Sequence, residues 1–206
     1  MNNKILIAIT GGIGCGKSMV SQLLKVMGFT VYDCDANAKQ LMLTDKELME
    51  GLTDLFGKET YFADGTLNKK HLAASIFGNA DALQQMNALV HPAVARDLKA
   101  QMLNDKHRIF FFESAILFES HFDHLVSPDI TICVTSPLEL RIARATARDH
   151  STREQVMGRI ESQMPQEEKD RRADYLVIND EKNSVIHQID KLLNSISWNF
   201  NYHKNS

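Results

Sequence analysis

The feature that most limits what this chain can fold into is the segment Gly11-Gly-Ile-Gly-Cys-Gly-Lys-Ser18, which fits the pattern G-x-x-x-x-G-K-[ST] without a mismatch. It follows an apolar run, Lys4–Ile9, that is typical of a buried strand, and it opens a helical pattern from about Lys17 to Met27. This strand–loop–helix context is the one in which such a motif cradles nucleotide phosphates. The alternative is a chance glycine turn before a helix, and motif and context together argue against it.

Each residue type in this P-loop has a physical reason. Glycines let the backbone turn tightly and point its N–H groups at phosphate oxygens, and the helix N-terminus adds partial positive charge. Lys17 can bridge the β- and γ-phosphates of ATP, and the Ser18 hydroxyl can ligate Mg²⁺. The predicted ATP contacts in this segment are Gly12, Ile13, Gly14, Cys15, Gly16, Lys17, Ser18 and Met19.

The rest of the chain predicts an α/β fold with a mostly parallel, five-stranded sheet and helices on both faces. The second strand, Phe29–Tyr32, ends at Asp33, and the third, Arg108–Phe112, ends at Glu113. The remaining strands and the last helix are expected at Asp129–Val134, Tyr175–Ile178 and about Asn183–Ile196. The third strand ends in Glu rather than the Asp common in motor proteins, and the guanine-reading Asn-Lys-x-Asp pattern is absent. Both points favour a kinase over a motor or a switch.

Two stretches are predominantly helical. Residues 36–105 show one turn-like interruption, Ala63–Thr66, and a second helical pattern extends from about Pro137 to Arg172. Ser114–Pro128 is too short for a full crossover helix and is a candidate mobile flap. We therefore predict a single domain over 1–206. In it, 1–35 and 106–206 form a nucleotide-binding core with lid elements at about 114–128 and 141–165, and 36–105 form a helical insert.

Charge and composition favour an intracellular protein. The net charge of −3 does not suggest a nucleic-acid partner. Three cysteines without metal-ligand spacing favour a reduced compartment, and no apolar run approaches the roughly 20 residues of a membrane helix. The first apolar run is too short for a signal peptide. We expect a cytoplasmic protein without a membrane partner; protein partners stay unknown.

Asp33 is a candidate general base. It lies just past the second strand, whose carboxyl end should neighbour the P-loop in a parallel sheet, and a carboxylate there could accept a proton from an attacking hydroxyl. Asp35 lies two residues on. The alternative for both is helix capping, which Asp favours, and for Asp35 capping is the preferred interpretation.

Arginines at helical spacing form the third feature. Arg141, Arg144 and Arg148 share a helix face, and cations around the equatorial oxygens favour phosphoryl transfer. A helical lid would bring Arg144 and Arg148 to ATP on closure. For Arg141 we favour a solvated helix face.

In addition, the chain resembles the dephospho-CoA kinases over nearly its whole length. Thr10–Ser18 is similar to the family's T-G-G-I-G-S-G-K-S, and Asp33-Cys-Asp35 to its D-A-D. Further matches follow in order: Asp64–Leu67, Ile76-Phe77, His91-Pro92, Leu117–Glu119, Arg144 with Arg148, Arg159-Ile160 with Gln163, and Ala173–Asn179. A P-loop is shared by many families, whereas this ordered set is far more specific.

The resemblance implies transfer of the ATP γ-phosphate to the ribose 3′-hydroxyl of dephospho-CoA, the last step of coenzyme A synthesis, with Mg²⁺. It implies Asp33 as base, Lys17 as phosphate clamp, Arg144 as lid cation and residues 36–105 as the CoA-binding insert. Asp35, His91 and Pro92 would contact the substrate, although a turn with a capping histidine is an equal alternative for His91-Pro92. Asn179 would lie beside the adenine.

Three residues or segments depart from the family pattern. Cys15 replaces serine, for which we expect little effect because the phosphate needs its N–H. Met19 replaces a threonine, which removes one possible hydroxyl contact, and Ser114-Ala-Ile116 alters the start of the flap. The competing functions are another nucleoside or nucleotide kinase and a nucleotide-dependent switch. A metal-site protein ranks third, because His121 and His124 lack a companion cluster.

Overall fold

The computed structural model describes residues 4–202, with side chains up to residue 196. The chain divides into two compact units. The first comprises the residues up to Val31, His107–Asp123 and the residues from Pro128 on; the second comprises Tyr32–Lys106 and His124–Ser127. The predicted insert, residues 36–105, falls inside the second unit. Its role in binding CoA stays a prediction.

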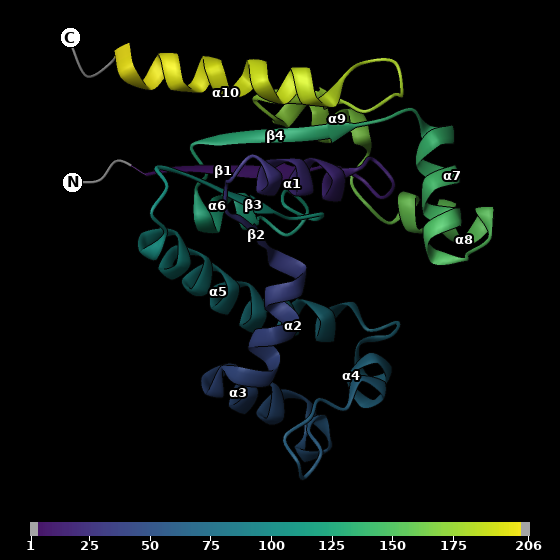
Figure 1. Ribbon diagram of the computed structural model, residues 1–206. Helices are drawn as coiled ribbons and strands as arrows, with labels where there is room; N and C mark the ends of the chain where they lie inside the picture. The colour runs from purple at the N-terminus through teal and green to yellow at the C-terminus, as the bar shows by residue number, and fades with distance from the viewer. Residues whose placement is uncertain (1–3, 203–206) are drawn as a thin grey trace. The chain divides into compact units, whose positions relative to one another are not determined.

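A five-stranded sheet organises the chain, as the sequence predicted (Figure 1). The strands are β1 (Ile5–Thr10), β2 (Val31–Asp33), β3 (Ile109–Glu113), β4 (Ile130–Thr135) and β5 (Tyr175–Ile178), in the order β2-β3-β1-β4-β5. β1 pairs in parallel with both β3 and β4, and β4 pairs in parallel with β5.

The expected position of β2 is wrong, because β3 lies between β2 and the P-loop strand. The physical reason lies in burial. β3 carries three fully buried phenylalanines, Phe110–Phe112, and such a strand belongs in the middle of a sheet covered on both faces. β2 has three residues and ends in exposed Asp33, which suits an edge.

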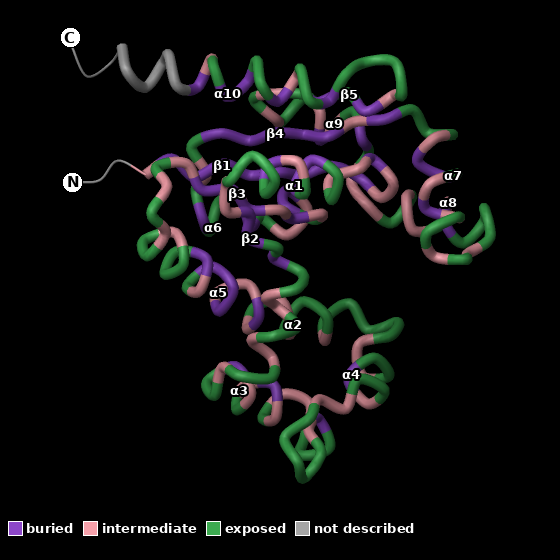
Figure 2. The backbone as a smooth tube through the Cα atoms, in the orientation of Figure 1, coloured by how far each residue is buried: buried purple, intermediate pink, exposed green. Residues whose placement is uncertain are grey.

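Alternate side chains of the strands build the main core of the first unit. Ile5, Ile7 and Ile9 of β1 face the same way as Phe111 of β3 and pack in one cluster. That cluster also holds alternate residues of β4 and residues from two helices, α1 (Lys17–Val26) and α10 (Val185–Tyr202). Figure 2 shows the strands β1 and β4 buried along almost their whole length. Since every residue of β1 is buried, the P-loop that follows it starts from a rigid support.

After β4, the stretch that the sequence predicted to be helical forms three separate helices. They are α7 (Leu138–Asp149), α8 (Arg153–Glu161) and α9 (Gln166–Arg172). The first break falls at His150, whose φ of 51° is left-handed, and Thr152 then begins α8 with a capping box. The second break is Pro165, which precedes the first residue of α9. α9 packs on β4.

Three apolar side chains of the predicted flap are part of the packed interior. Leu117, Phe118 and Phe122 are buried, and the rings of Phe112 and Phe122 meet edge to face with centroids 6.1 Å apart. The segment also contains a short helix, α6 (Phe122–Val126). Its action as a lid element stays a prediction.

The second unit is helical, as predicted. It contains α2 (Cys34–Thr44), α3 (Lys46–Phe56), the 3₁₀ turn η1 (Lys58–Thr60), α4 (Lys69–Ile76) and α5 (Ala80–Asn104). The predicted interruption at Ala63–Thr66 is a turn closed by an antiparallel bridge between Tyr61 and Leu67. Among the described residues, no helix combines the length and apolarity needed to cross a bilayer.

The interpretation of His91-Pro92 as a turn is wrong, because both residues lie inside the 25-residue helix α5. Pro92 has no N–H to donate to the carbonyl of the residue four positions earlier. The flanking turns keep the helix continuous: Val90, Ala93, Val94 and Ala95 are all buried. Packing therefore overrides the local preference of a proline to end a helix.

Candidate active site

The P-loop backbone takes a shape that suits glycine alone at three of its positions, Gly11, Gly14 and Gly16, all of which have a positive φ. Gly14 and Gly16 have φ values of 76° and 97°, in the left-handed region. A Cβ on Gly14 would lie 2.2 Å from the carbonyl oxygen of Arg141, and one on Gly16 would lie 2.1 Å from Nδ2 of Asn179. The loop thus follows a path with no room for a side chain, and Gly16 is also the N-cap of α1.

The lysine of the motif is folded back over the loop. Lys17 Nζ donates to the carbonyl oxygens of Gly11 at 2.9 Å and Gly12 at 3.3 Å. Ser18 and Met19, at the start of α1, are exposed. An ammonium group and an exposed hydroxyl therefore lie at the end of a helix that carries partial positive charge, which suits an anionic ligand.

The other side of the loop is bonded to side chains from the α8–α9 region. Gln166 Oε1 accepts from Gly12 N at 3.0 Å, and Gln163 Oε1 accepts from Ile13 N at 3.0 Å. In this structure these two predicted phosphate contacts therefore donate to glutamines. Sequence reasoning noted Gln163 only as a family match and missed Gln166, for which the local pattern offers no signal.

Arg141 is not on a solvated helix face, so the interpretation favoured for it is wrong. It is only 6% exposed, and its Nε donates to the carbonyl oxygen of Ile13 at 3.0 Å. The helical spacing of three residues placed Arg141 beside Arg144, but whether that face meets solvent or the P-loop depends on residues far away in the chain.

The side chain of Cys15 also has a role that we did not expect. It is fully buried, and its Sγ donates to Gln166 Oε1 at 3.2 Å. Burial raises the pKa of the Cys15 thiol, while Arg141 and Lys17 oppose that shift. The thiol therefore stays protonated and able to donate.

Arg144 and Asn179 come together at the loop. Asn179 is buried and its Nδ2 donates to the carbonyl oxygen of Cys15 at 2.9 Å. Arg144 donates to the Asn179 carbonyl oxygen and to Ser136 Oγ, both at 3.1 Å, and pairs with Glu181 at 3.3 Å. The structure thus brings two of the predicted ATP contacts, from α7 and from the residue after β5, to one place.

Arg148 is directed elsewhere in this structure. Its guanidinium bonds both oxygens of Asp149, at 2.7 and 3.0 Å, and Arg159 reaches the same carboxylate at 2.8 Å. The hydrogen bonds from Arg148 and then Arg159 hold the pKa of Asp149 well below its usual range. Arg148 is 62% exposed, so this pair is weak and exchangeable.

The second unit carries the predicted substrate residues. Asp33 is the N-cap of α2: its Oδ1 accepts from Ala36 N at 2.9 Å, so the capping role belongs to Asp33 rather than Asp35. Asp35 lies in the first turn of α2 and is exposed. Burial lowers the pKa of His91.

A buried ion pair connects the segment after β3 to α9. Lys169 is 0% exposed; its Nζ lies 2.6 Å from Glu119 Oε1 and donates to the Ala115 carbonyl oxygen at 2.8 Å. Glu119 Oε1 also accepts from Met164 N at 3.2 Å. The other oxygen, Oε2, is buried and has no hydrogen-bond partner among the described residues.

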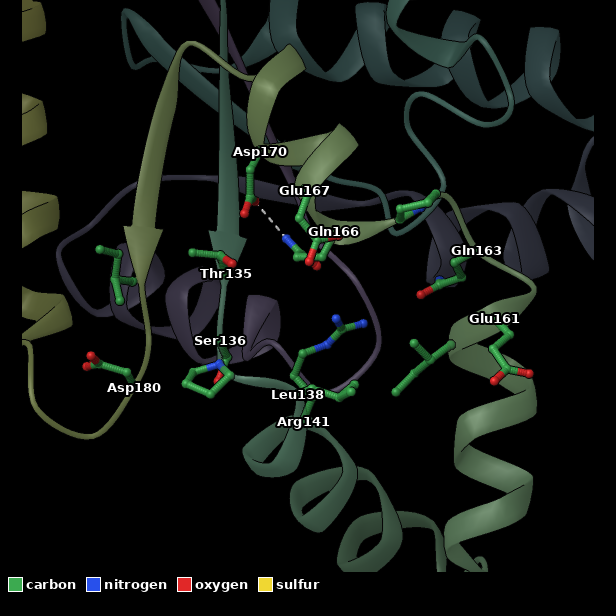
Figure 3. A pocket seen from close by; sticks show the side chains of 14 residues that line it. Thr135, Ser136, Leu138, Arg141, Glu161, Gln163, Gln166, Glu167, Asp170 and Asp180 are labelled. Atoms are coloured by element: carbon green, nitrogen blue, oxygen red, sulfur yellow. Dashed lines mark hydrogen bonds between the residues drawn. The ribbon is translucent and has the colours of Figure 1, made fainter.

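A cavity of about 650 Å³ adjoins the glutamine side of the P-loop (Figure 3). Its lining includes Arg141, Gln163, Gln166 and Asp170. Figure 3 shows Gln166 bonded to Asp170 on α9, with Arg141 rising from α7 toward them. The cavity therefore borders the side chains from α7 and the α8–α9 region that bond the P-loop.

The residues present fit Mg²⁺ carried on a nucleotide. Mg²⁺ in such sites takes few protein ligands, because phosphates and waters complete its shell. The exposed Ser18 hydroxyl has the chemistry of such a ligand, and over residues 4–202 no group of three or more His, Cys, Asp or Glu side chains forms a separate metal site. The carboxylate of Glu113, at the end of β3, has a partner within the protein: it accepts a hydrogen bond from Ser21 Oγ of α1 at 2.5 Å.

A parallel sheet with a glycine loop leading into α1, a lysine over that loop and arginines on a following helix defines a P-loop kinase. Comparisons with known proteins agree. The family model described as CoaE, dephospho-CoA kinase, matches residues 5–184. A dephospho-CoA kinase from Bacteroides fragilis is 44% identical over 190 residues, which cover 92% of this chain and 91% of that protein.

Solved structures are similar as well. The crystal structure of TT1252 from Thermus thermophilus is 34% identical with a TM-score of 0.81, covering 94% of this chain and 97% of that one. The dephospho-CoA kinase from Campylobacter jejuni is 26% identical with a TM-score of 0.66, covering 94% and 98%. The chain belongs to the dephospho-CoA kinase family. It is an ATP-dependent phosphotransferase that acts in the final step of coenzyme A biosynthesis.

Proposed function

We propose that the P-loop holds the ATP phosphates while Lys17 and Arg144 balance the charge that develops as the γ-phosphate moves to the ribose 3′-hydroxyl of dephospho-CoA. The observation that carries this proposal is the loop itself, with left-handed Gly14 and Gly16 and with Lys17 bonded across it. Preorganised donors of this kind stabilise a transition state because they need no reorganisation during the reaction.

The proposed role of each cation follows from its present partners. Lys17 Nζ donates hydrogen bonds to the carbonyl oxygens of Gly11 and Gly12. When ATP binds, a phosphate oxygen takes the place of these carbonyl oxygens as the partner of Lys17. Arg144 is anchored by Ser136 and Asn179, and its pair with the exposed Glu181 exchanges easily. Arg148 exchanges Asp149 for phosphate in the same way.

Ser18 is the proposed protein ligand of Mg²⁺. When bound, Mg²⁺ neutralises charge on the β- and γ-phosphate oxygens. Ile13, Cys15 and Met19 contribute backbone to the phosphate site, and Asn179 lies near the adenine in this proposal. We keep Asp35, His91 and Pro92 as proposed contacts of dephospho-CoA, and a cytoplasmic location stays a prediction.

Asp33 is the proposed general base for the 3′-hydroxyl. Its Oδ1 is used in the cap of α2, and its Oδ2 is the oxygen we propose for the proton. Asp33→Asn keeps the cap, because Asn caps helices as well as Asp does, but it cannot take a proton. We expect kcat to fall by about 10²–10⁴-fold, with thermal stability unchanged. Full activity of a folded Asp33→Asn protein would remove Asp33 from the reaction.

A coupled assay of ADP release tests the whole assignment. ADP release from ATP should require Mg²⁺ and dephospho-CoA, and the product should be phosphorylated at the 3′ position. A panel of nucleosides and nucleotides as acceptors separates this activity from that of other kinases with the same fold. ATP hydrolysis independent of any acceptor would contradict the proposed roles.

A further inference from the structure

We propose that Gln166 is a positioning residue for ATP: its side-chain amide holds the P-loop in the shape that binds phosphate. The inference builds on the family's kinase activity and adds a residue outside the motif. Gln166 is the first residue of α9 and is 9% exposed. It lies 154 residues from Gly12 in the chain and bonds directly to it.

The two ends of the amide face partners of opposite kinds. Its Oε1 accepts from Gly12 N at 3.0 Å and from Cys15 Sγ at 3.2 Å. Its Nε2 donates to Asp170 Oδ1 at 2.8 Å and lies 3.4 Å from the Val134 carbonyl oxygen of β4. A backbone N–H can only donate and a carboxylate can only accept, so the amide has one possible orientation.

This arrangement ties the P-loop to α9 and to the buried strand β4. Gly12 and Cys15 flank Gly14, whose path is already limited by the Arg141 backbone. Through Gln166 both are connected to Asp170 on α9 and to β4, a strand buried along almost its whole length. Without the amide, the loop keeps its sequence but loses two of the bonds that fix its curvature, so its N–H groups no longer converge before ATP arrives.

The same contacts accommodate cysteine at position 15. The Sγ atom lies in the apolar cluster formed by β1, α1 and β4, where a thiol is easily accommodated, and still donates to Gln166. Cys15 therefore reports on the state of the loop, because alkylation of this fully buried thiol requires the loop to open.

Gln166→Leu is the first test. A neutral hydrogen bond accounts for a factor of about 2–12 in an equilibrium, so losing the two loop bonds should raise the KM for ATP by roughly 4–140-fold. The KM for dephospho-CoA should stay within about twofold. Iodoacetamide labelling of Cys15, followed by mass spectrometry, should accelerate at least about tenfold and slow again with a non-hydrolysable ATP analogue. A small-molecule thiol added to the reaction is the reference for reagent activity, because Cys34 and Cys133 are buried as well.

A rescue experiment tests the orientation of the amide. Gln166→Glu keeps the shape but sets a carboxylate oxygen against Asp170, and it should impair ATP binding. Asp170→Asn alone should have little effect, because its amide oxygen still accepts. In the double variant Gln166→Glu/Asp170→Asn, the new amide donates to the new carboxylate, and the KM for ATP should fall well below that of Gln166→Glu, short of the wild-type value because the carboxylate still faces the Val134 carbonyl oxygen. If Gln166→Leu fails to fold, comparing Gln166→Glu with the double variant still tests whether the amide of Gln166 positions the P-loop.

Gln188→Leu is the matched control. Gln188 bonds the N–H and C=O of Ile178 on the edge strand β5, at 2.8 and 2.9 Å, so its loss removes two backbone bonds and leaves those that Gln166 makes to the P-loop in place. The proposal is overturned if this control raises the KM for ATP as much as Gln166→Leu. It is also overturned if Gln166→Leu leaves KM and Cys15 labelling unchanged, or if the double variant is no better than Gln166→Glu.

Discussion

Replacing Lys169 by methionine should cost about 3–5 kcal/mol in the free energy of unfolding, because it leaves a carboxylate largely buried without its counter-ion. Lys169 is 0% exposed, and the side chain of Glu119 is 21% exposed. The ammonium group bonds Glu119 Oε1 at 2.6 Å and the Ala115 carbonyl oxygen at 2.8 Å. Of the hydrogen bonds to Glu119 within the described residues, the one from Met164 N is left after the substitution.

The magnitude follows from opposing contributions. Unit charges at the observed 2.6 Å attract by roughly 6 kcal/mol at an effective dielectric constant of about 20, and the bond to Ala115 adds about 1.5–3 kcal/mol. Burying the ammonium group costs several kcal/mol, which the methionine variant no longer bears. The remaining loss lowers the melting temperature by about 6–20 °C in a chain of this length.

Urea denaturation followed by circular dichroism measures the effect. Glu119→Gln/Lys169→Met removes both charges and should recover at least about 1.5 kcal/mol relative to Lys169→Met, since a buried pair replaced as a whole is often close to neutral. Arg153→Met is the matched control: it breaks a pair with Glu139 whose side chains are 53% and 72% exposed, and it should cost less than about 1 kcal/mol. The reasoning is refuted if Lys169→Met costs no more than this control, or if removing the carboxylate brings no recovery.

Three further predictions concern charge at the site. Lys17→Ala should lower kcat by at least about 10²-fold with the fold intact, because it removes a cation from the transferring phosphate; near-normal turnover of a folded variant would contradict the assignment. Arg144→Ala should lower kcat more than it weakens ATP binding, and steady-state kinetics showing only a raised KM for ATP would reassign Arg144 to ground-state binding. Burial lowers the pKa of His91, so the unfolded chain binds a proton more readily and stability falls as pH drops below about 6.5. His91→Gln should reduce that loss between pH 7.5 and pH 5 in denaturation experiments, and an unchanged slope would exclude His91 as its source.

The sequence by itself determined the elements that depend on local pattern. The apolar run before Gly11 predicted β1, and the motif that follows predicted a loop entering α1 at Lys17, where the helix begins. Side-chain periodicity is a property of neighbouring residues, so strands and helices of this kind can be read without knowledge of their partners. The same holds for the spacing of Arg144 and Arg148 on one helix.

Only the tertiary structure decided which distant residues meet. It placed β3 between β2 and β1, because a strand buried on both faces takes an interior position in the sheet. It kept Pro92 inside a helix, because packing on either side outweighs one missing hydrogen bond. It buried Arg141 against Ile13 and brought Gln166 to the P-loop across 154 residues. Contacts between residues so far apart in the chain leave no periodic pattern in the sequence. The side chains that bond the P-loop from α7 and α9 can therefore be identified only in the folded structure.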